Sequence, residues 1–147
     1  MALAVADRLM AAFTAANTAT TDAQRKITVY NGTIPGVPTD RYAIVYAGPP
    51  TLLRGSWGPV AADSSGIVTV HFAASRPGTT ASPVNEAIAI AEAGVRALLD
   101  NTFQVDGYSQ NIYLEHVITE PPNDVAVVAD RVTSEIAAQF TYTAARI

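Results

Sequence analysis

The sequence contains no cysteine, and that absence removes several kinds of site at once. A disulfide framework, a thiolate metal centre and a cysteine nucleophile are all excluded. The lack of cysteine does not decide the compartment, because a protein without thiols is compatible with any redox environment.

Positive charge is also scarce. Lys26 is the one lysine, and nine basic residues face thirteen acidic ones, for a formal net charge of −4. A protein that binds duplex nucleic acid needs a positive face to neutralise phosphates. The charge balance therefore argues against a specific nucleic-acid binder.

Long hydrophobic runs are missing. None approaches the roughly 18 to 20 apolar residues that cross a bilayer, so we expect no membrane partner. The amino terminus, MALAVADRLMAAFTAA, lacks a basic lead and carries Asp7 and Arg8 where a signal peptide would be unbroken. Its apolar residues recur at helical spacing, which predicts a surface helix over 2–16. Without a signal peptide or a membrane-spanning run, we expect the protein to stay soluble in the cell that makes it.

The length and composition predict one domain over 1–147, because 147 residues with 49% apolar content are enough to bury a core without cross-links. A second helix is predicted over 83–101, with Ser82 as its cap and Pro83 in its first position. Its buried stripe is expected to comprise Ile88, Ala91, Val95, Leu98 and Leu99.

Strands are predicted from β-branched, aromatic and alternating residues, and they end at glycine and proline. The alternation of the fourth predicted strand places Ile112, Leu114, His116 and Ile118 on one face. The stretch 124–137 is ambiguous between helix and strand, and about 49–66 is expected to be a long loop or hairpin arm. The predicted strands cover 27–32, 41–48, 67–75, 111–119 and 139–147.

The predicted fold is α+β: a mainly antiparallel or mixed sheet of about four or five strands with two helices packed on one face.

No chemical motif emerges. The turn RPGTTAS before the second helix lacks the second glycine and the lysine of a P-loop, so we assign it a structural role even with Arg76 nearby. His71 and His116 stand 45 residues apart without the local spacing of a metal site. Ser56 does not fit a nucleophile elbow, because the position two residues before it, where that motif has glycine, is Arg54. We therefore predict no catalytic residue, no cofactor, no metal and no enzymatic activity.

One stretch has the composition of an interface. Leu52, Leu53, Arg54 and Trp57 lie in a segment rich in glycine and proline, and tryptophan and arginine are the types that anchor protein interfaces. The alternative is that Trp57 covers the sheet.

The order of elements resembles that of the tail-terminator proteins of long-tailed bacteriophages, especially those that infect actinobacteria. The resemblance covers most of the chain. It rests on LAVADRLMAAF, RYAIVYAG, IVTVHFAAS with NEAIAIAEAGVRALL, and QFTYTAAR.

The resemblance implies a structural virion protein, made in the host cytoplasm, that forms a ring of usually six copies at the head-proximal end of the tail. Such a ring stops polymerisation of the tail-tube protein and offers a surface to the head-tail connector or stopper protein. Genome DNA passes through its lumen without specific binding. Acidic residues that repel phosphate are expected to line the opening, and the candidates are Asp63, Asp106 and Asp124.

Two alternatives remain open. The chain is also compatible with another head-to-tail joining protein, a stopper or a connector-completion subunit. From a different class, it is compatible with a small α+β ligand-binding domain or enzyme whose pocket lies between the second helix and the sheet.

Overall fold

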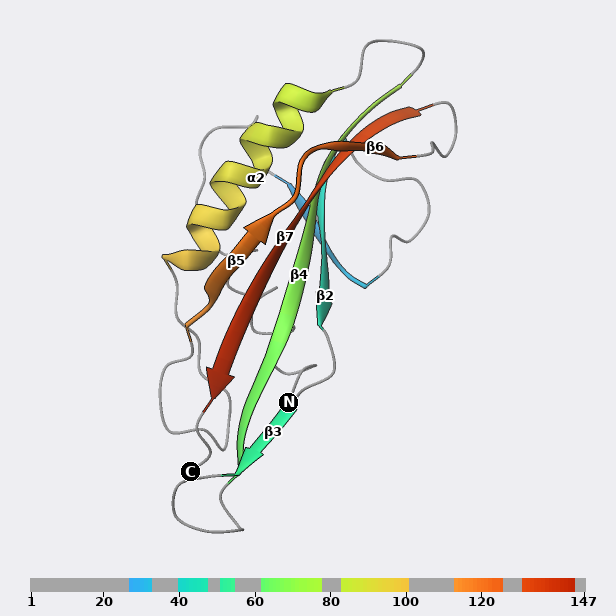
Figure 1. The fold of residues 1–147 in the computed structure, drawn as a ribbon. Helices are drawn as coiled ribbons and strands as arrows, with labels where there is room; N and C mark the ends of the chain where they lie inside the picture. Colours follow the sequence, from blue (N-terminus) through green and yellow to red (C-terminus); the bar gives the residue numbers. More distant parts are fainter. Residues whose placement is uncertain are drawn as a thin grey trace.

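The computed structural model describes residues 27–32, 40–47, 51–54, 62–77, 83–100, 113–125 and 131–144. Within them, one helix lies against one face of a single sheet (Figure 1). The elements are β1 (Thr28–Asn31), β2 (Arg41–Ala47), β3 (Thr51–Arg54), β4 (Ala62–Pro77), α2 (Val84–Leu99), β5 (Glu115–Thr119), β6 (Asn123–Val125) and β7 (Arg131–Ala144).

The sheet is mixed. Its main path runs β1-β2-β4-β7-β5, while β3 pairs with β4 and β6 pairs with β7. The β1–β2 pair is parallel and every other pair is antiparallel. The α+β class and the mixed sheet agree with the sequence-based expectation. One helix belongs to the described part of the chain, and the helix predicted over 2–16 lies outside it.

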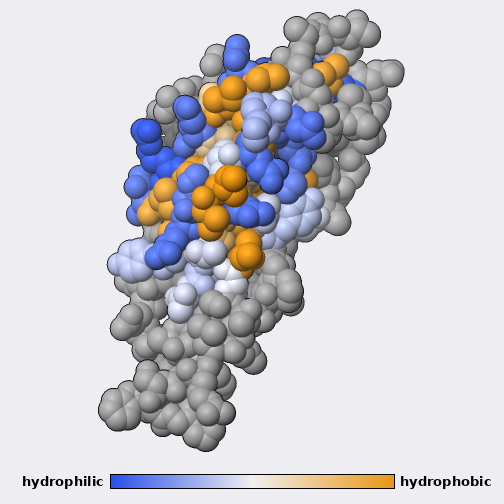
Figure 2. All heavy atoms as spheres, viewed as in Figure 1, coloured by the Kyte–Doolittle hydropathy of each residue, from blue (hydrophilic) through white to orange (hydrophobic). Residues whose placement is uncertain are grey.

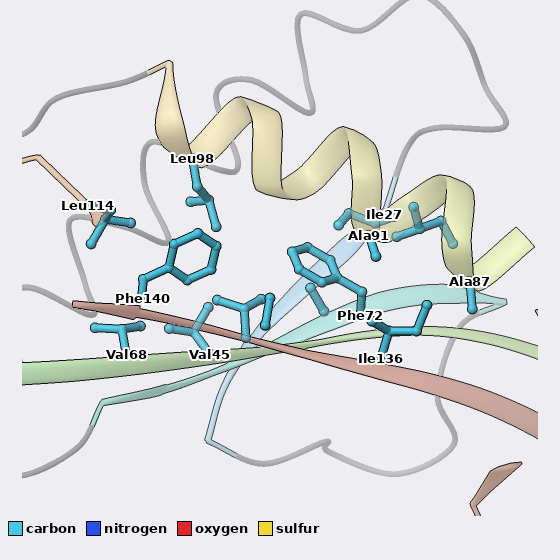
Figure 3. Packing of buried hydrophobic residues seen from close by; sticks show 14 of the residues in the cluster. Ile27, Val45, Val68, Phe72, Ala87, Ala91, Leu98, Leu114, Ile136 and Phe140 are labelled. Carbon is cyan, nitrogen blue, oxygen red and sulfur yellow. The ribbon is translucent and has the colours of Figure 1, made fainter. Parts of the chain in front are cut away.

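The long pair β4–β7 is the spine of the sheet, with Ser64–Pro77 facing Arg131–Ala144 in continuous register. Residues opposite each other in an antiparallel pair lie on the same face of the sheet. Both side chains of each β4–β7 pair therefore face α2, or both face away from it. Phe72 and Phe140 are fully buried, and both rise from the sheet toward α2 in Figure 3. The main core therefore lies between the spine and the helix. Its buried members on β4 and β7 include Val68, Val70, Phe72, Ala74, Ile136, Ala138 and Phe140.

Helix α2 carries Glu86 in its first turn and Arg96 in its last, which complements the helix dipole. Pro83 lies at the cap and its carbonyl accepts from the Ala87 amide at 3.0 Å, so the helix begins one residue later than predicted. The expected cap, Ser82, lies outside the described residues.

The buried stripe of α2 differs from the predicted one. Ala91 and Leu98 are buried as expected, but Ile88 and Leu99 are 37% and 41% exposed. The helix approaches the sheet through small residues, because Phe72 and Phe140 already fill the space between the layers. The residues that face the sheet are Ala87, Ile90, Ala91, Gly94 and Leu98.

The opposite face of the sheet holds a second, smaller cluster. Tyr42, Ile44 and Ala73 are buried there, with Tyr30 packed against them. The rings of Tyr30 and Tyr42 meet edge to face with centroids 6.1 Å apart. Burial, with a smaller contribution from the charge of Glu135, raises the pKa of Tyr42 to about 12.

The segment 49–66 contains a β-hairpin. Thr51 pairs with Ser65 and Arg54 with Ala62, so β4 begins five residues before the predicted start at Ile67. Gly66 is a strand residue opposite Tyr142, and not the turn that its sequence context indicates. A Cβ at position 66 would come within 2.6 Å of the Tyr142 hydroxyl, which explains why glycine suits this position.

Two further strands differ from their predictions. The last strand begins at Arg131, before the predicted start at Gln139, so part of the ambiguous stretch 124–137 is strand. In β5 the register shifts between His116 and Ile118: His116 pairs with Phe140, whereas Ile118 pairs with Gln139. Leu114 and His116 share the face of Phe140 as predicted, but the prediction is wrong for Ile118, because the β-bulge places its side chain on the opposite face; Ile112 lies outside the described residues.

In the part of the chain that the structure describes, no helix is both long enough and apolar enough to cross a membrane.

Candidate interaction surface

A groove of about 600 Å³ runs between α2 and the segment that joins β5 to β6. Ile88, Val95 and Leu99 form its helix wall, and Ile136 of β7 lies at its base. Thr119 and Pro122 belong to the opposite wall, and Pro122 is exposed. In Figure 2, apolar residues on this face of the molecule stand among hydrophilic ones. Large aliphatic side chains that stay in water beside a hollow are typical of a binding surface.

The rim of the groove is mainly acidic. Glu92, Asp100 and Glu120 contribute carboxylates, and Arg96 contributes one guanidinium. Glu92, Arg96, Asp100 and Glu120 are all exposed, so water screens each of these charges. The groove therefore combines an apolar centre with a negative rim.

Strand β5 continues this surface at the end of the sheet. All five of its side chains are exposed, with Val117 at 57%. The Glu120 amide, just beyond β5, donates to the Ala137 carbonyl at 2.8 Å, which keeps the segment against β7. Among the described strands, β7 is the one that pairs with β5, so β5 lies at one edge of the described sheet.

The two histidines do not form a common site. His71 Nδ1 contacts Glu135 Oε1 on the face away from α2, and its ring lies edge-on to Tyr46 with centroids 5.0 Å apart. His116 Nε2 lies 2.7 Å from Thr119 Oγ1, and its ring leans on Phe140. Each histidine is thus held by its own neighbours. Within the described ranges, no group of three His, Asp or Glu side chains is placed to hold a metal ion.

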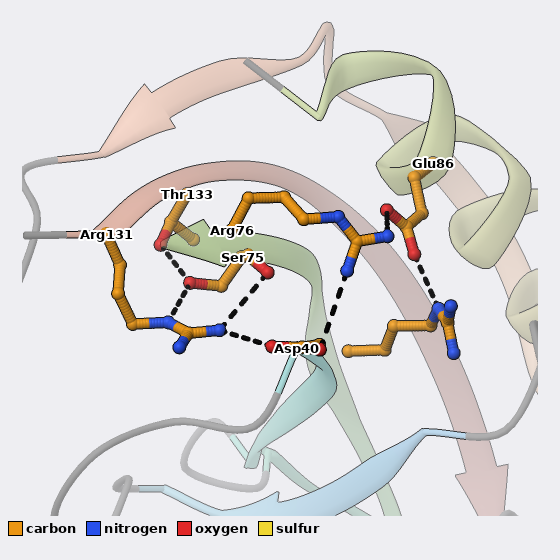
Figure 4. Close-up of polar contacts among 7 residues, drawn as sticks. Asp40, Ser75, Arg76, Glu86, Arg131 and Thr133 are labelled. Carbon is orange, nitrogen blue, oxygen red and sulfur yellow. Dashed lines mark hydrogen bonds and ion pairs between the residues drawn. The ribbon is translucent and has the colours of Figure 1, made fainter. Parts of the chain in front are cut away.

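A network of arginines and carboxylates joins the start of α2 to the ends of three strands (Figure 4). Glu86 accepts from Arg41 Nε at 2.5 Å and from Arg76 Nη2. Asp40 accepts from Arg131 Nη2 and lies 3.6 Å from Arg76 Nη1. Arg76, which the sequence places near a possible anion site, is therefore engaged by two carboxylates of the fold itself.

Ser75 completes this network beneath the ion pairs. Its hydroxyl oxygen accepts from Arg131 Nε at 2.9 Å and from the Thr133 hydroxyl at 3.0 Å. Its amide donates to the Asp40 carbonyl at 2.7 Å. Buried polar groups that partner one another in this way fix a structure, so we assign the network a structural role.

The predicted interface residues fall mostly on one strand. Leu52, Leu53 and Arg54 belong to β3, and Trp57 lies outside the described residues. The structure does not bring β3 to the α2–β5 groove of the same molecule, because β3 pairs with β4 on the side that β2 also occupies.

The predicted lumen residues are not gathered at one place. Asp63 pairs with Leu53 at the start of β4, next to Ser64, which faces Ala144 at the end of β7. Asp124 pairs with Ser134, near the start of β7. At about 3.3 Å per strand residue, these two positions lie about 35 Å apart along the sheet. Asp106 lies outside the described residues.

The sequence analysis considered a pocket between the second helix and the sheet as an alternative, but it did not identify the residues that line the groove. The clearest sequence signal for it is the width of the apolar arc of α2, which includes Ile88 and Leu99 in addition to the residues that pack against the core. An arc wider than one layer can bury indicates a second contact surface.

Comparison of the sequence with protein-family models and with curated proteins gives no match. One solved structure, of a protein without a descriptive name, aligns with 99% of this chain and 92% of its own chain, at 18% identity and a TM-score of 0.45. Structural similarity of that degree does not indicate a function.

Proposed function

We propose that the protein is a structural virion protein, a ring-forming tail terminator at the head-proximal end of a bacteriophage tail. It caps the tail-tube protein, stops tube growth and offers a joining surface to the connector or stopper. The proposal also includes the predicted helix over 2–16, packed on the same face of the sheet as α2. The sequence resemblance described above motivates this proposal.

The observation that carries it is the presence of two different surfaces on opposite lateral sides of one sheet. The α2–β5 groove and strand β5 lie on one side, and the β3–β4 hairpin lies on the other. A ring of identical subunits requires a heterologous interface, in which one surface of each copy meets a different surface of the next. A protein with a single self-complementary patch would form a two-fold dimer instead.

The net charge of −4 suits a ring through which DNA moves, because an acidic wall repels phosphates and does not bind them. We propose that Asp63, Asp106 and Asp124 face the opening. Since Asp63 and Asp124 belong to distant parts of the sheet, both line the opening only when the sheet runs along the channel. Changing these residues to lysine should then slow DNA ejection, and unchanged ejection would count against this placement.

The test is to mix the purified protein with assembling tail-tube protein from the same genome and to measure tube length and end occupancy by electron microscopy. Shortened tubes with a ring at one end are expected. Bare tubes of unaltered length would overturn the terminator assignment and favour a stopper or connector-completion subunit.

The alternative of a ligand-binding domain is favoured by one observation, the groove between α2 and the sheet. Its centre is apolar, and the charged groups among its described lining residues are exposed at the rim, so these residues do not form the converging buried polar groups of an enzyme site. A thermal shift on addition of a small apolar ligand, without ring formation, would support this alternative.

A further inference from the structure

The α2–β5 groove has a length that fits one short strand. Its helix wall runs from Ile88 to Leu99, which spans about 17 Å at 1.5 Å per residue. Strand β3 has four residues and therefore extends about 13 Å.

The charges of the groove and of the β3 segment are complementary. The rim carries Glu92, Asp100 and Glu120 against the single Arg96, so it is net negative. Arg54 is the only charged residue between Arg41 and Asp63 in the sequence, and it follows Leu52 and Leu53 directly. An apolar segment with one cation thus matches an apolar groove with an acidic rim.

The topology requires that such a contact form between molecules. Strand β3 pairs with β4 on the side that faces β2, whereas the groove lies beyond β7 on the side of β5 (Figure 1). The two surfaces of one molecule therefore point to different neighbours. Repeating the contact gives a directional series of subunits, which closes as a ring when the rotation allows it.

We propose that the α2–β5 groove of each copy receives strand β3 of the next copy, with Leu52 covering Leu99 and with Arg54, on the same strand face as Leu52, reaching the acidic rim. This inference deepens the proposed function and rests on it for the closed ring. The contact itself is a property of the isolated protein.

The test uses the natural absence of cysteine. Three mixtures combine the Arg54→Cys variant with Glu92→Cys, with Asp100→Cys or with Glu120→Cys, and each is oxidised alone and on tail tubes. At least one mixture should shift protein from the 15.4 kDa band to a band of about double mass on a non-reducing gel. The matched control pairs Arg54→Cys with Thr28→Cys, an exposed position on β1 at the far end of the sheet, and should leave the monomer band unchanged.

A second measurement covers the case in which the disulfide geometry is unfavourable. Arg54→Glu should lower the assembled fraction in sedimentation, and Glu92→Arg or Glu120→Arg in the same chain should restore it, because the charges are again opposite. Absence of both the cross-link and the charge rescue would overturn the inference. Dimers formed by a single groove variant with itself would also overturn it, in favour of a two-fold contact.

The two proposals fail separately. Capped tubes without the β3 cross-link would leave the terminator function in place and remove this interface. Subunits that cross-link to one another but leave tubes uncapped would support the interface and contradict the terminator function.

Discussion

Gly94 of α2 lies directly against the ring of Phe72 on β4. A Cβ at position 94 would stand 2.1 Å from Phe72 Cε1 and 2.6 Å from Cζ. No Cβ occupies such a distance in a folded protein, and Phe72 is fully buried, so the ring has little room to move. The missing side chain therefore sets how closely helix and sheet approach.

We expect Gly94→Ala to destabilise the protein although alanine favours helices. The gain in helix propensity is about 1 kcal/mol. Overpacking of a tight core costs about 1–3 kcal/mol, and this contact belongs at the upper end. Urea denaturation should show a net loss of about 1–2 kcal/mol. In a Phe72→Leu background the same substitution should cost less, because the smaller side chain leaves space; an equal cost in both backgrounds would refute the steric explanation.

Truncating either of two neighbouring leucines near the end of α2 should affect stability very differently. Leu98 is 4% exposed and packs in the core, so Leu98→Ala should lower the free energy of unfolding by about 2–5 kcal/mol. Leu99 faces the groove, so Leu99→Ala should change it by less than about 0.5 kcal/mol. Thermal unfolding of the two variants provides the comparison. Similar losses in both would place Leu99 in the core, as the sequence predicted.

That pair illustrates what a sequence can predict about this helix. Helical spacing identifies the apolar arc correctly but not which part of the arc faces the sheet. The choice depends on Phe72 and Phe140, which belong to distant strands and leave room only for small residues such as Gly94 and Ala91. Volume matching between separate elements has no local signal.

The strands show the same limit. β-Branched residues locate the centre of β4 well, but its start was hidden by Ser64, Ser65 and Gly66, which are typical of turns. Ser64 and Ser65 are strand residues because β3 and β7 pair with them from both sides, and Gly66 pairs with Tyr142 of β7. The bulge in β5 likewise depends on its register with β7. Residue types alone indicate the candidate interface on β3, whereas the groove can be recognised only from the way α2 packs on the sheet.

Glu86 should stabilise the start of α2 through its two arginine partners. Glu86→Gln removes the charge that Arg41 and Arg76 both contact and weakens the favourable interaction with the helix dipole. Because Glu86 is about one fifth exposed, we expect a loss of about 1–2 kcal/mol in urea denaturation. Glu92→Gln on the same helix is the matched control, since Glu92 is exposed; its free energy should change by no more than about 0.5 kcal/mol. A loss in the control as large as that in Glu86→Gln would mean that the network contributes nothing specific.

Tyr42 should make the stability fall at high pH. Burial favours the neutral phenol, so the folded protein holds this proton up to a pKa of about 12, against 10.0 for an ordinary tyrosine. The folded state therefore binds more protons than the unfolded state between these two values. The contribution to stability is complete below pH 10.0 and is lost as the pH rises toward about 12, at up to about 1.4 kcal/mol per pH unit. Urea denaturation over this range, together with the ultraviolet absorbance of tyrosinate, should show a late titration step that coincides with unfolding. The Tyr42→Phe variant lacks the ionising group and should keep a flatter stability profile; an identical profile in both proteins would assign the alkaline transition to other residues.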